Sequence, residues 1–217
     1  MKRLSLVVLL AACSHATSES DVVAYLQAHP ATRAQLVTKA EGRITDATKI
    51  HRGDKPLTLI GPTLDVGDAA PDVTVFDSKL EPVKLAALEG KLVVLSVVPS
   101  IDTHVCESQT HHVAAAIEQM PANVAVFTVS RDLPFAQQRF FEEAQIDKRM
   151  TMVSDYRGGD FGHAFGAEVQ ESGLLARSVW VIGPDGKIAY RQLVDDQGQE
   201  PDLEPVIAAV KKIAGQK

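Results

Sequence analysis

The stretch LVVLSVVPSIDTHVC, residues 92–106, carries the strongest structural signal in this chain of 217 residues. Its first seven residues are almost continuously aliphatic, which is typical of a strand that is buried on both faces of a sheet. Beyond the loop that begins at Pro99, apolar residues recur at helical spacing between Val113 and Met120. Cys106 therefore lies where a buried strand turns into a helix, and a cysteine in that place is a candidate nucleophile.

Strand-like and helix-like segments alternate along the rest of the chain. The pattern predicts a second buried strand over 124–130, a helix capped by Asp132 that runs to about 144, and a strand over 151–153. Two strand-like runs then flank the turn Gly183–Gly186, and a helix over about 202–214 follows. This order predicts an α/β protein with a thioredoxin-like fold, in which helices flank a central mixed sheet.

The domain is predicted to start with a β-hairpin. Leu57–Ile60 and Leu64–Val66 are short apolar runs, and the turn-forming residues Gly61-Pro62-Thr63 separate them. We therefore expect these two runs to pair as antiparallel strands.

The composition indicates one globular domain with an extension before it. Turn residues begin to alternate with strand-like runs at Gly53, so we expect the domain to cover residues 53–217. Residues 13–52 are polar and mixed, which favours a tether with one or two short helices. A packed extension of the domain is the alternative for Ala31–Ile50.

The first residues have the pattern of a bacterial export signal. Lys2 and Arg3 precede an apolar run that is too short to span a bilayer. Leu10-Ala11-Ala12-Cys13 then resembles a lipobox, whose cysteine is lipidated on sulfur and becomes the first mature residue. We expect a signal peptide over residues 1–12 and a lipid-anchored protein of the bacterial cell envelope that faces the periplasm. An ordinary secretory signal and a misplaced start codon are the alternatives, and either leaves Cys13 free or absent.

Charge and cysteine content exclude several classes of function. The net charge of −6 and the absence of a basic cluster argue against a nucleic-acid partner. Two cysteines, one of them in the leader, cannot build a disulfide framework. Thr103 and Gln109 occupy the positions where a Cys-x-x-Cys partner of Cys106 would stand, so thioredoxin-type disulfide exchange is not the main activity. No motif indicates a cofactor.

Three separated blocks resemble the thiol peroxidase branch of the peroxiredoxin family. They are Val98–Cys106, Ser130–Gln137 and Gly173–Val179, and they come in the order of the family. The resemblance runs from Gly53 to the C-terminus. It implies a thiol peroxidase that reduces hydrogen peroxide or organic hydroperoxides, with a preference for alkyl and lipid hydroperoxides. It also implies an external thiol or thioredoxin-like protein as reductant, and a homodimer.

The same resemblance assigns roles to four residues. Cys106 is the peroxidatic cysteine, which becomes a sulfenic acid, and Thr103 is the hydroxyl that orients the thiol and the peroxide. Arg177 is the guanidinium of the active site, and Pro99 shields the substrate pocket. Cys106 read alone is more ordinarily a small buried apolar residue, Thr103 a helix cap, and Arg177 a surface residue paired with a carboxylate.

Physical chemistry supports a cation beside the thiol. A free cysteine has a pKa of about 8.5, so it is mostly protonated at neutral pH. Reaching a value of about 6 requires about 3.4 kcal/mol at 1.36 kcal/mol per unit. A helix N-terminus contributes about 2 kcal/mol at best, which is not enough. A cation such as Arg177 is therefore needed, and the fork of donors of an arginine also suits the peroxide oxygens, which gain charge as the O–O bond breaks.

The chain departs from the branch at the resolving cysteine. Phe141 occupies the position of that cysteine on the following helix. An aromatic ring cannot attack a sulfenic acid, so we expect a one-cysteine mechanism in which an external thiol reduces Cys106. The alternative is that the cysteine was lost together with the activity. The chain is then a non-catalytic lipoprotein that acts as a redox sensor or binds a partner.

Three histidines near Cys106 invite a second interpretation. His104 stands two residues before the cysteine and could help to hold a thiolate, but a solvated loop histidine is the more ordinary interpretation. His111 and His112 follow on the predicted helix, and with His104 and the Cys106 thiolate they suggest a metal or copper-chaperone site. Adjacent histidines on a helix point in different directions, which argues against that site. We therefore expect no bound metal.

Overall fold

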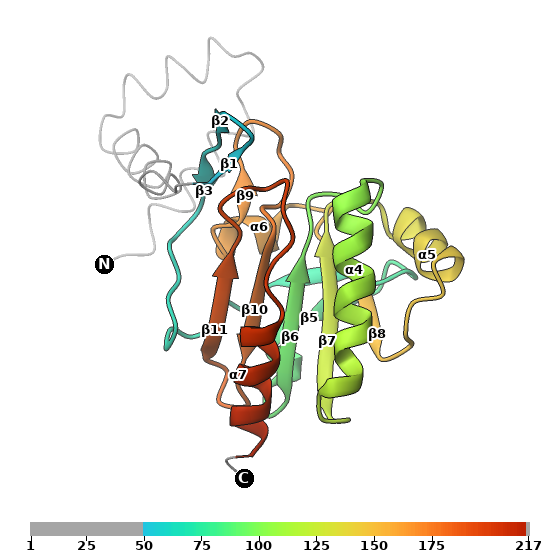
Figure 1. The fold of residues 1–217 in the computed structure, drawn as a ribbon, viewed down its shortest axis with the longest axis vertical. Helices are drawn as coiled ribbons and strands as arrows, with labels where there is room; N and C mark the ends of the chain where they lie inside the picture. The colour runs from blue at the N-terminus through green and yellow to red at the C-terminus, as the bar shows by residue number, and fades with distance from the viewer. Residues whose placement is uncertain (1–49, 216–217) are drawn as a thin grey trace, which may run out of the picture. The chain divides into compact units, whose positions relative to one another are not determined.

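A seven-stranded mixed sheet forms the centre of the structure, a computed structural model that describes residues 50–215 (Figure 1). The predicted signal peptide, Cys13 and nearly all of the predicted tether lie outside the described residues. In spatial order the strands are β11 (Ile188–Leu193), β10 (Ser178–Ile182), β6 (Leu92–Val97), β7 (Val124–Ser130), β8 (Met150–Ser154), β4 (Thr74–Phe76) and β5 (Pro82–Lys84). β6, β7 and β8 are parallel, and the other pairs are antiparallel. The predicted thioredoxin-like fold with a mixed sheet is confirmed.

Helices cover the sheet on both faces. They are α4 (His104–Ala116), α5 (Pro134–Glu143), α6 (Asp160–Ala164) and α7 (Glu204–Ala214), with 3₁₀ turns at Leu85–Leu88 and Ile117–Gln119. Figure 1 shows α4 and α7 on the near face and α6 behind the sheet. None of the helices between residues 50 and 215 has the length and apolar character needed to cross a membrane.

The aliphatic run of β6 is buried because each face of the strand meets its own core. Leu92 and Val94 belong to the apolar cluster that also contains residues of α4 and α7. Val93, Leu95 and Val97 belong to the cluster on the opposite face, which contains the side chains of α6. A strand alternates its side chains between two faces, so a strand with a core on each side has to be apolar throughout.

The N-terminal hairpin exists, but its predicted position is wrong. β1 (His51–Arg52) and β2 (Lys55–Pro56) pair antiparallel, and Gly53 in the turn between them has φ +56°. β3 (Leu59–Ile60) pairs instead with β9 (Glu168–Val169), whose residues stand 110 and 108 positions after their partners in β3. The chain does not reverse at Gly61, because that glycine packs directly on the α6 region: a Cβ there would lie 2.3 Å from the carbonyl oxygen of His163.

Register brings the three sequence blocks to one end of the sheet. Val97 at the end of β6 pairs with Ser178 at the start of β10, and Ser178 also pairs with Leu193 near the end of β11. In the parallel direction Val97 pairs with Val129, so β7 ends beside β6. The loops that follow β6, β7 and β11 therefore meet the segment that precedes β10.

Candidate active site

Cys106 lies in the first turn of α4, and its side chain is fully buried, with 0% exposure. It is a free cysteine. Thr103 takes the extended backbone of a helix N-cap, but its side chain makes no capping hydrogen bond. Its hydroxyl instead lies 3.0 Å from Cys106 Sγ and 3.1 Å from the carbonyl oxygen of Ser100. The interpretation of Thr103 as an ordinary helix cap therefore does not hold.

Arg177 approaches the same sulfur from the other side. It directly precedes β10 and is 2% exposed, so the interpretation as a surface arginine is wrong. Its NH2 atom donates to Cys106 Sγ at 3.2 Å, and its NH1 atom donates to Gln109 Oε1 at 2.6 Å. The structure thus brings together Cys106, Thr103 and Arg177, which are separated in sequence by up to 74 positions.

Gln109 is a part of the site that the sequence interpretation missed. It is fully buried on α4, and its Nε2 atom donates to Ser96 Oγ at 2.9 Å while its Oε1 atom receives the bond from Arg177. One signal was available in the sequence. Gln109 stands three residues after Cys106, on the same face of a helix whose other buried positions are mostly apolar or small.

The loop before α4 is held by Asp132 at the end of β7. The Asp132 carboxylate accepts hydrogen bonds from Ser100 Oγ at 2.7 Å and from the backbone N–H of Ile101 at 2.8 Å. The prediction that Asp132 caps the next helix is wrong, because its carboxylate is used in this way. α5 begins at Pro134 instead, where the missing N–H of proline costs little.

Of Pro99 and Cys13, the structure describes only Pro99. Pro99 is half-buried at the start of the loop between β6 and α4, and its role as a shield of the pocket stays a prediction. Cys13 lies outside the described residues.

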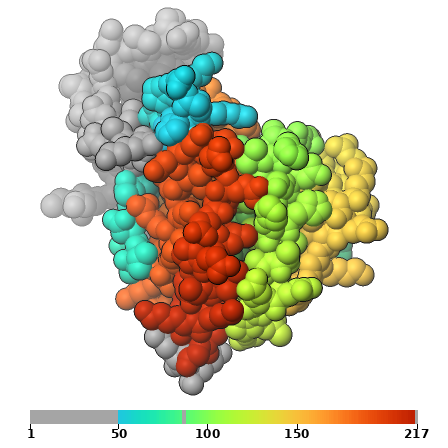
Figure 2. Space-filling view, in the orientation of Figure 1, coloured from blue at the N-terminus to red at the C-terminus, as the bar shows by residue number. Residues whose placement is uncertain are grey.

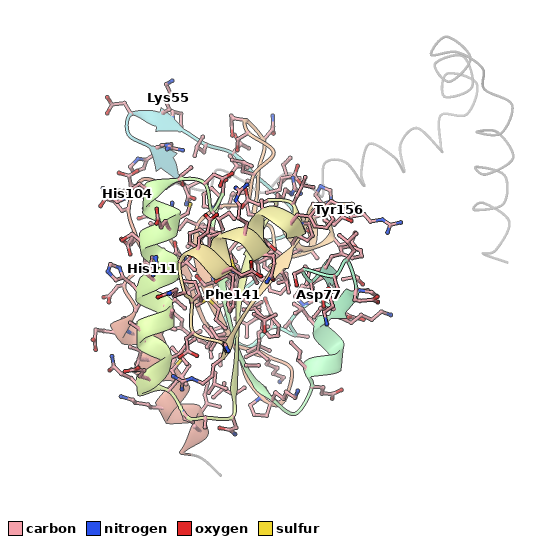
Figure 3. The ribbon with its side chains drawn as sticks, turned by 90° about the vertical axis from the view of Figure 1, so that its right-hand side faces the viewer. Lys55, Asp77, His104, His111, Phe141 and Tyr156 are labelled. Atoms are coloured by element: carbon pink, nitrogen blue, oxygen red, sulfur yellow. The ribbon has the colours of Figure 1, made fainter. Side chains whose placement is uncertain are left out.

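Phe141 lies on α5, the helix labelled in Figure 3 by this residue. Its side chain packs against an apolar cluster formed by Val98, Ile101, Cys106 and Met152. The position that carries a resolving cysteine in the branch is therefore filled by a ring that contributes to the wall around Cys106.

His111 and His112 have different partners in the structure. His104 and His111 project from α4 in Figure 3, and both are exposed. His111 makes an edge contact with Phe140 at 6.3 Å between ring centroids, and His112 Nδ1 lies 2.6 Å from Glu200 Oε2. Within residues 50–215, no three His, Cys, Asp or Glu side chains lie together in a way that would hold a metal ion.

Glu200 adds a carboxylate on the α4 side of Arg177. Burial raises its pKa, but hydrogen bonds from Ser108 and His112, together with the charges of His112 and Arg177, outweigh burial and hold the pKa below its usual value. Glu200 therefore stays ionised at neutral pH and contributes negative potential on this side of the arginine.

A second charged cluster fixes the segment that leads to Arg177. Arg131 donates to the carbonyl oxygen of Gly173, and its side chain pairs with Glu168 at 2.8 Å and Asp155 at 3.4 Å. Burial raises the pKa of the Asp155 carboxyl, although the N–H groups at the start of α6 and the charge of Arg131 oppose this. Arg131 thus ties the end of β7 to the turn before β10.

A buried thiol that receives one hydroxyl and one guanidinium, on a thioredoxin-like fold, defines a thiol-dependent oxidoreductase. The family model described as Redoxin matches residues 65–207. The chain belongs to the Redoxin family.

Its relatives within that family include thiol peroxidases. The thiol peroxidase of Bacillus subtilis is 44% identical over 158 residues, which cover 73% of this chain and 93% of that protein. The thiol peroxidase of Staphylococcus aureus is 42% identical over 166 residues, or 76% of this chain and 99% of that protein.

Solved structures agree with this assignment. A peroxiredoxin-like protein from Aquifex aeolicus has a TM-score of 0.72 at 36% identity, over 79% of this chain and 99% of that chain. A thiol peroxidase from Chromobacterium violaceum has a TM-score of 0.70 over 77% of this chain and 98% of that chain, and at 17% identity it supports the fold alone.

Proposed function

We propose that this chain reduces peroxides through a sulfenic acid on Cys106 and that an external thiol returns the sulfur to its starting state. Thiol-dependent peroxidase activity itself follows from membership of the family and from the thiol peroxidase relatives. The proposal adds the residues and the one-cysteine cycle.

The observation that carries the proposal is the guanidinium of Arg177 at 3.2 Å from a fully buried sulfur. A cation in a water-poor site favours the thiolate over the thiol. Thr103 lies 3.0 Å from the sulfur and 3.1 Å from the carbonyl oxygen of Ser100. Its hydroxyl has one hydrogen, which it gives to the sulfur, to that carbonyl or to an incoming oxygen.

The first step transfers one oxygen atom. The Cys106 thiolate attacks the outer oxygen of ROOH, an S–O bond forms, the O–O bond breaks, and ROH leaves after it takes up a proton. Sulfur is oxidised by two electrons and the peroxide is reduced by two. The leaving oxygen gains negative charge, and the N–H groups of Arg177 are the donors best placed to stabilise that charge.

The second step needs a thiol from outside the described structure. Cys106 is the free cysteine of the described residues, and Phe141 fills the place of a resolving partner. An external thiol attacks the sulfenic sulfur and releases water, which leaves a mixed disulfide. A second thiol then displaces the Cys106 thiolate and departs as the oxidised disulfide.

One experiment tests the first step. The purified protein is mixed with one equivalent of hydrogen peroxide in the presence of a dimedone-type probe, and the labelled residue is found by mass spectrometry. We expect one equivalent of peroxide to be lost and the label to sit on Cys106. Cys106→Ser is expected to abolish peroxide loss, and Cys13→Ser is the matched control that retains it. If the wild-type protein consumes no peroxide, the chain is not a peroxidase and the interpretation as a redox sensor gains.

We further propose that organic hydroperoxides are preferred over hydrogen peroxide. The proposal rests on the resemblance to the thiol peroxidase branch and on the apolar wall formed by Val98, Ile101, Met152 and Phe141 around the sulfur. Second-order rate constants for cumene hydroperoxide, linoleate hydroperoxide and hydrogen peroxide test it. A faster reaction with hydrogen peroxide than with both organic peroxides would contradict the preference.

We also propose that the chain is anchored by lipid on Cys13 in the bacterial cell envelope, facing the periplasm. Support comes from the sequence Leu10-Ala11-Ala12-Cys13 after a basic and apolar leader. The test is membrane fractionation with intact mass of the purified protein. Cys13→Ser is expected to leave the membrane fraction, whereas Cys106→Ser stays in it. An unmodified N-terminal region in membrane-purified protein would refute lipidation.

A further inference from the structure

Gln197 lies in the loop between β11 and α7 and is buried, with 4% exposure. We propose that Gln197 is a positioning residue for peroxide reduction: it fixes the guanidinium of Arg177 in the orientation that aims NH2 at Cys106 Sγ. The inference rests on the proposed function, because it concerns the arginine of that reaction.

Gln197 contacts Arg177 twice, from two different groups. Its side-chain Oε1 atom accepts the backbone N–H of Arg177, and its backbone carbonyl oxygen accepts the side-chain Nε–H of Arg177 at 3.2 Å. The first contact holds the backbone from which the arginine side chain starts. The second holds the inner edge of its guanidinium.

These contacts determine where the outer nitrogen points. A guanidinium is planar, so two fixed N–H directions define the whole group. Nε is fixed by Gln197 at 3.2 Å and NH1 is fixed by Gln109 at 2.6 Å. The position of NH2 is then fixed as well, and there it lies 3.2 Å from Cys106 Sγ.

Gln197 can act in this way because it is itself held in place. Its Nε2 atom donates to the carbonyl oxygen of Val194 at 2.6 Å, which leaves Oε1 facing Arg177. Its backbone N–H donates to the carbonyl oxygen of His51 at 2.8 Å, and His51 N–H donates to the carbonyl oxygen of Asp195 at 2.8 Å. Figure 2 shows the blue hairpin β1–β2 seated against the orange-red segment that follows β11. The hairpin therefore supports the loop that supports Arg177.

A purely structural role makes a different prediction. If the side chain of Gln197 only provides hydrogen bonds that hold the loop, its loss lowers stability and leaves the reaction of each folded molecule unchanged. If Gln197 positions the guanidinium, its loss weakens the contact with the thiolate in folded protein. Two readouts separate these roles: the rate constant of Cys106 oxidation and the pH profile of Cys106 alkylation by iodoacetamide.

The experiment uses three variants of the full chain, with circular dichroism to verify folding. Gln197→Met has similar length but makes no side-chain hydrogen bonds. We expect its rate constant with hydrogen peroxide to fall about tenfold, and its alkylation midpoint to move to higher pH by about half a unit. Gln197→Glu keeps an acceptor for the Arg177 N–H but loses the donor to the Val194 carbonyl oxygen, so its rate constant is expected to fall between those of Gln197→Met and wild type. Gln199→Met changes an exposed glutamine of the same loop and is expected to match wild type.

The outcomes distinguish this inference from the proposed function. If wild-type Cys106 is not oxidised by peroxide, the proposed function fails. If wild type reacts and Gln197→Met matches it in rate and in pH profile, only the role of Gln197 is overturned. Should Gln197→Met not fold, Gln197→Asn gives the same comparison, because its amide is one methylene too short to reach the Arg177 N–H.

Discussion

The sulfur of Cys106 has two polar partners, and they contribute in different ways. Arg177 contributes charge and a fixed set of donors at 3.2 Å, whereas Thr103 contributes one neutral donor at 3.0 Å. Charge-assisted hydrogen bonds are about twice as strong as neutral ones, so we expect the arginine to matter more.

Arg177→Lys is expected to lower the rate constant for peroxide reduction about a hundredfold, although the positive charge is kept. An ammonium group cannot contact Gln109, Gln197 and the sulfur together as the planar guanidinium does. Stopped-flow oxidation by hydrogen peroxide measures this. Arg191→Lys, at a half-buried arginine that pairs with Asp65, is the control and is expected to react like wild type. An unchanged rate in Arg177→Lys would show that charge alone is sufficient.

Thr103→Val removes the hydroxyl and keeps the shape of the side chain. We expect its rate constant to fall at least about tenfold, because one of the two donors to the sulfur is lost. Thr103→Ser keeps the donor and is expected to recover most of the rate in the same assay. Equal rates for Thr103→Val and wild type would mean that the hydroxyl acts only on the Ser100 carbonyl.

At the scale of residues, the sequence predicts the side chains around the sulfur better than the side chains that hold Arg177. Cys106 and Thr103 are neighbours within one motif, and Arg177 belongs to a block that resembles a known family. Gln109 and Gln197 carry no motif of their own. Their importance depends on tertiary distances to Arg177, 68 and 20 positions away in sequence, and no spacing rule reaches across those intervals.

Among the elements, α5 carries Phe141 at the position where the thiol peroxidase branch has its resolving cysteine. Phe141→Cys places a thiol on this helix beside the apolar cluster that contains Cys106. We expect one equivalent of peroxide to give a disulfide between Cys106 and the new thiol, seen as the loss of two hydrogens in the non-reduced mass. Stability is expected to fall by about 1–3 kcal/mol, because part of a packed ring is removed. Glu142→Cys is the control on the exposed side of the helix and is expected to form no such bond. A persistent sulfenate in Phe141→Cys would place α5 out of reach of Cys106.

The charged cluster around Arg131 connects β7, α6 and β9. Arg131→Met is expected to lower the free energy of unfolding by about 3–5 kcal/mol, because buried Asp155 loses its cation. Urea denaturation measures this change. Arg139→Met is the matched control: Arg139 and Asp102 are 61% and 65% exposed and lie 3.8 Å apart, so we expect a change below about 1 kcal/mol. Equal effects of the two substitutions would contradict the structural role of Arg131.

Helices and strands could be predicted where an apolar pattern runs over many residues. Strands that pair with a partner far away in the sequence could be predicted less well. β6 and α4 follow from their apolar patterns, and both are found as expected. The sequence predicts a hairpin at residues 57–66, because apolar runs flank the turn-forming residues Gly61-Pro62. The true partner of β3 is β9, and a two-residue strand gives no signal that identifies a partner so far away.

For the molecule as a whole, the lowered pKa of Glu200 predicts how the stability of the fold changes in acid. Its pKa is lower when the protein is folded, so its contribution to stability is present above the unfolded value of about 4.3 and is lost as pH falls through the folded value. Glu200→Gln is therefore expected to lower stability at pH 7 by less than about 1 kcal/mol, since the partner His112 is 63% exposed. The difference from wild type should shrink as the pH falls below about 4.

Thermal unfolding across pH 3 to 8 measures this difference, and Glu118→Gln, an exposed glutamate of the turn after α4, is the control. A difference between Glu200→Gln and wild type that grows towards low pH would have the wrong sign and would refute the assignment.

The ring of Phe141 also has a kinetic consequence for the whole molecule. A peroxidase that carries its own second thiol converts its sulfenic acid to an internal disulfide at a rate that does not depend on its surroundings, although an external reductant must still reduce that disulfide. In the proposed one-cysteine cycle the lifetime of the Cys106 sulfenic acid is inversely proportional to the concentration of the external reductant, because its removal is a bimolecular encounter. When that reductant runs low, each molecule removes one peroxide and then waits, and a second peroxide converts the waiting sulfenic acid irreversibly to a sulfinic acid. The supply of thiol thus sets both the throughput of this protein and its survival.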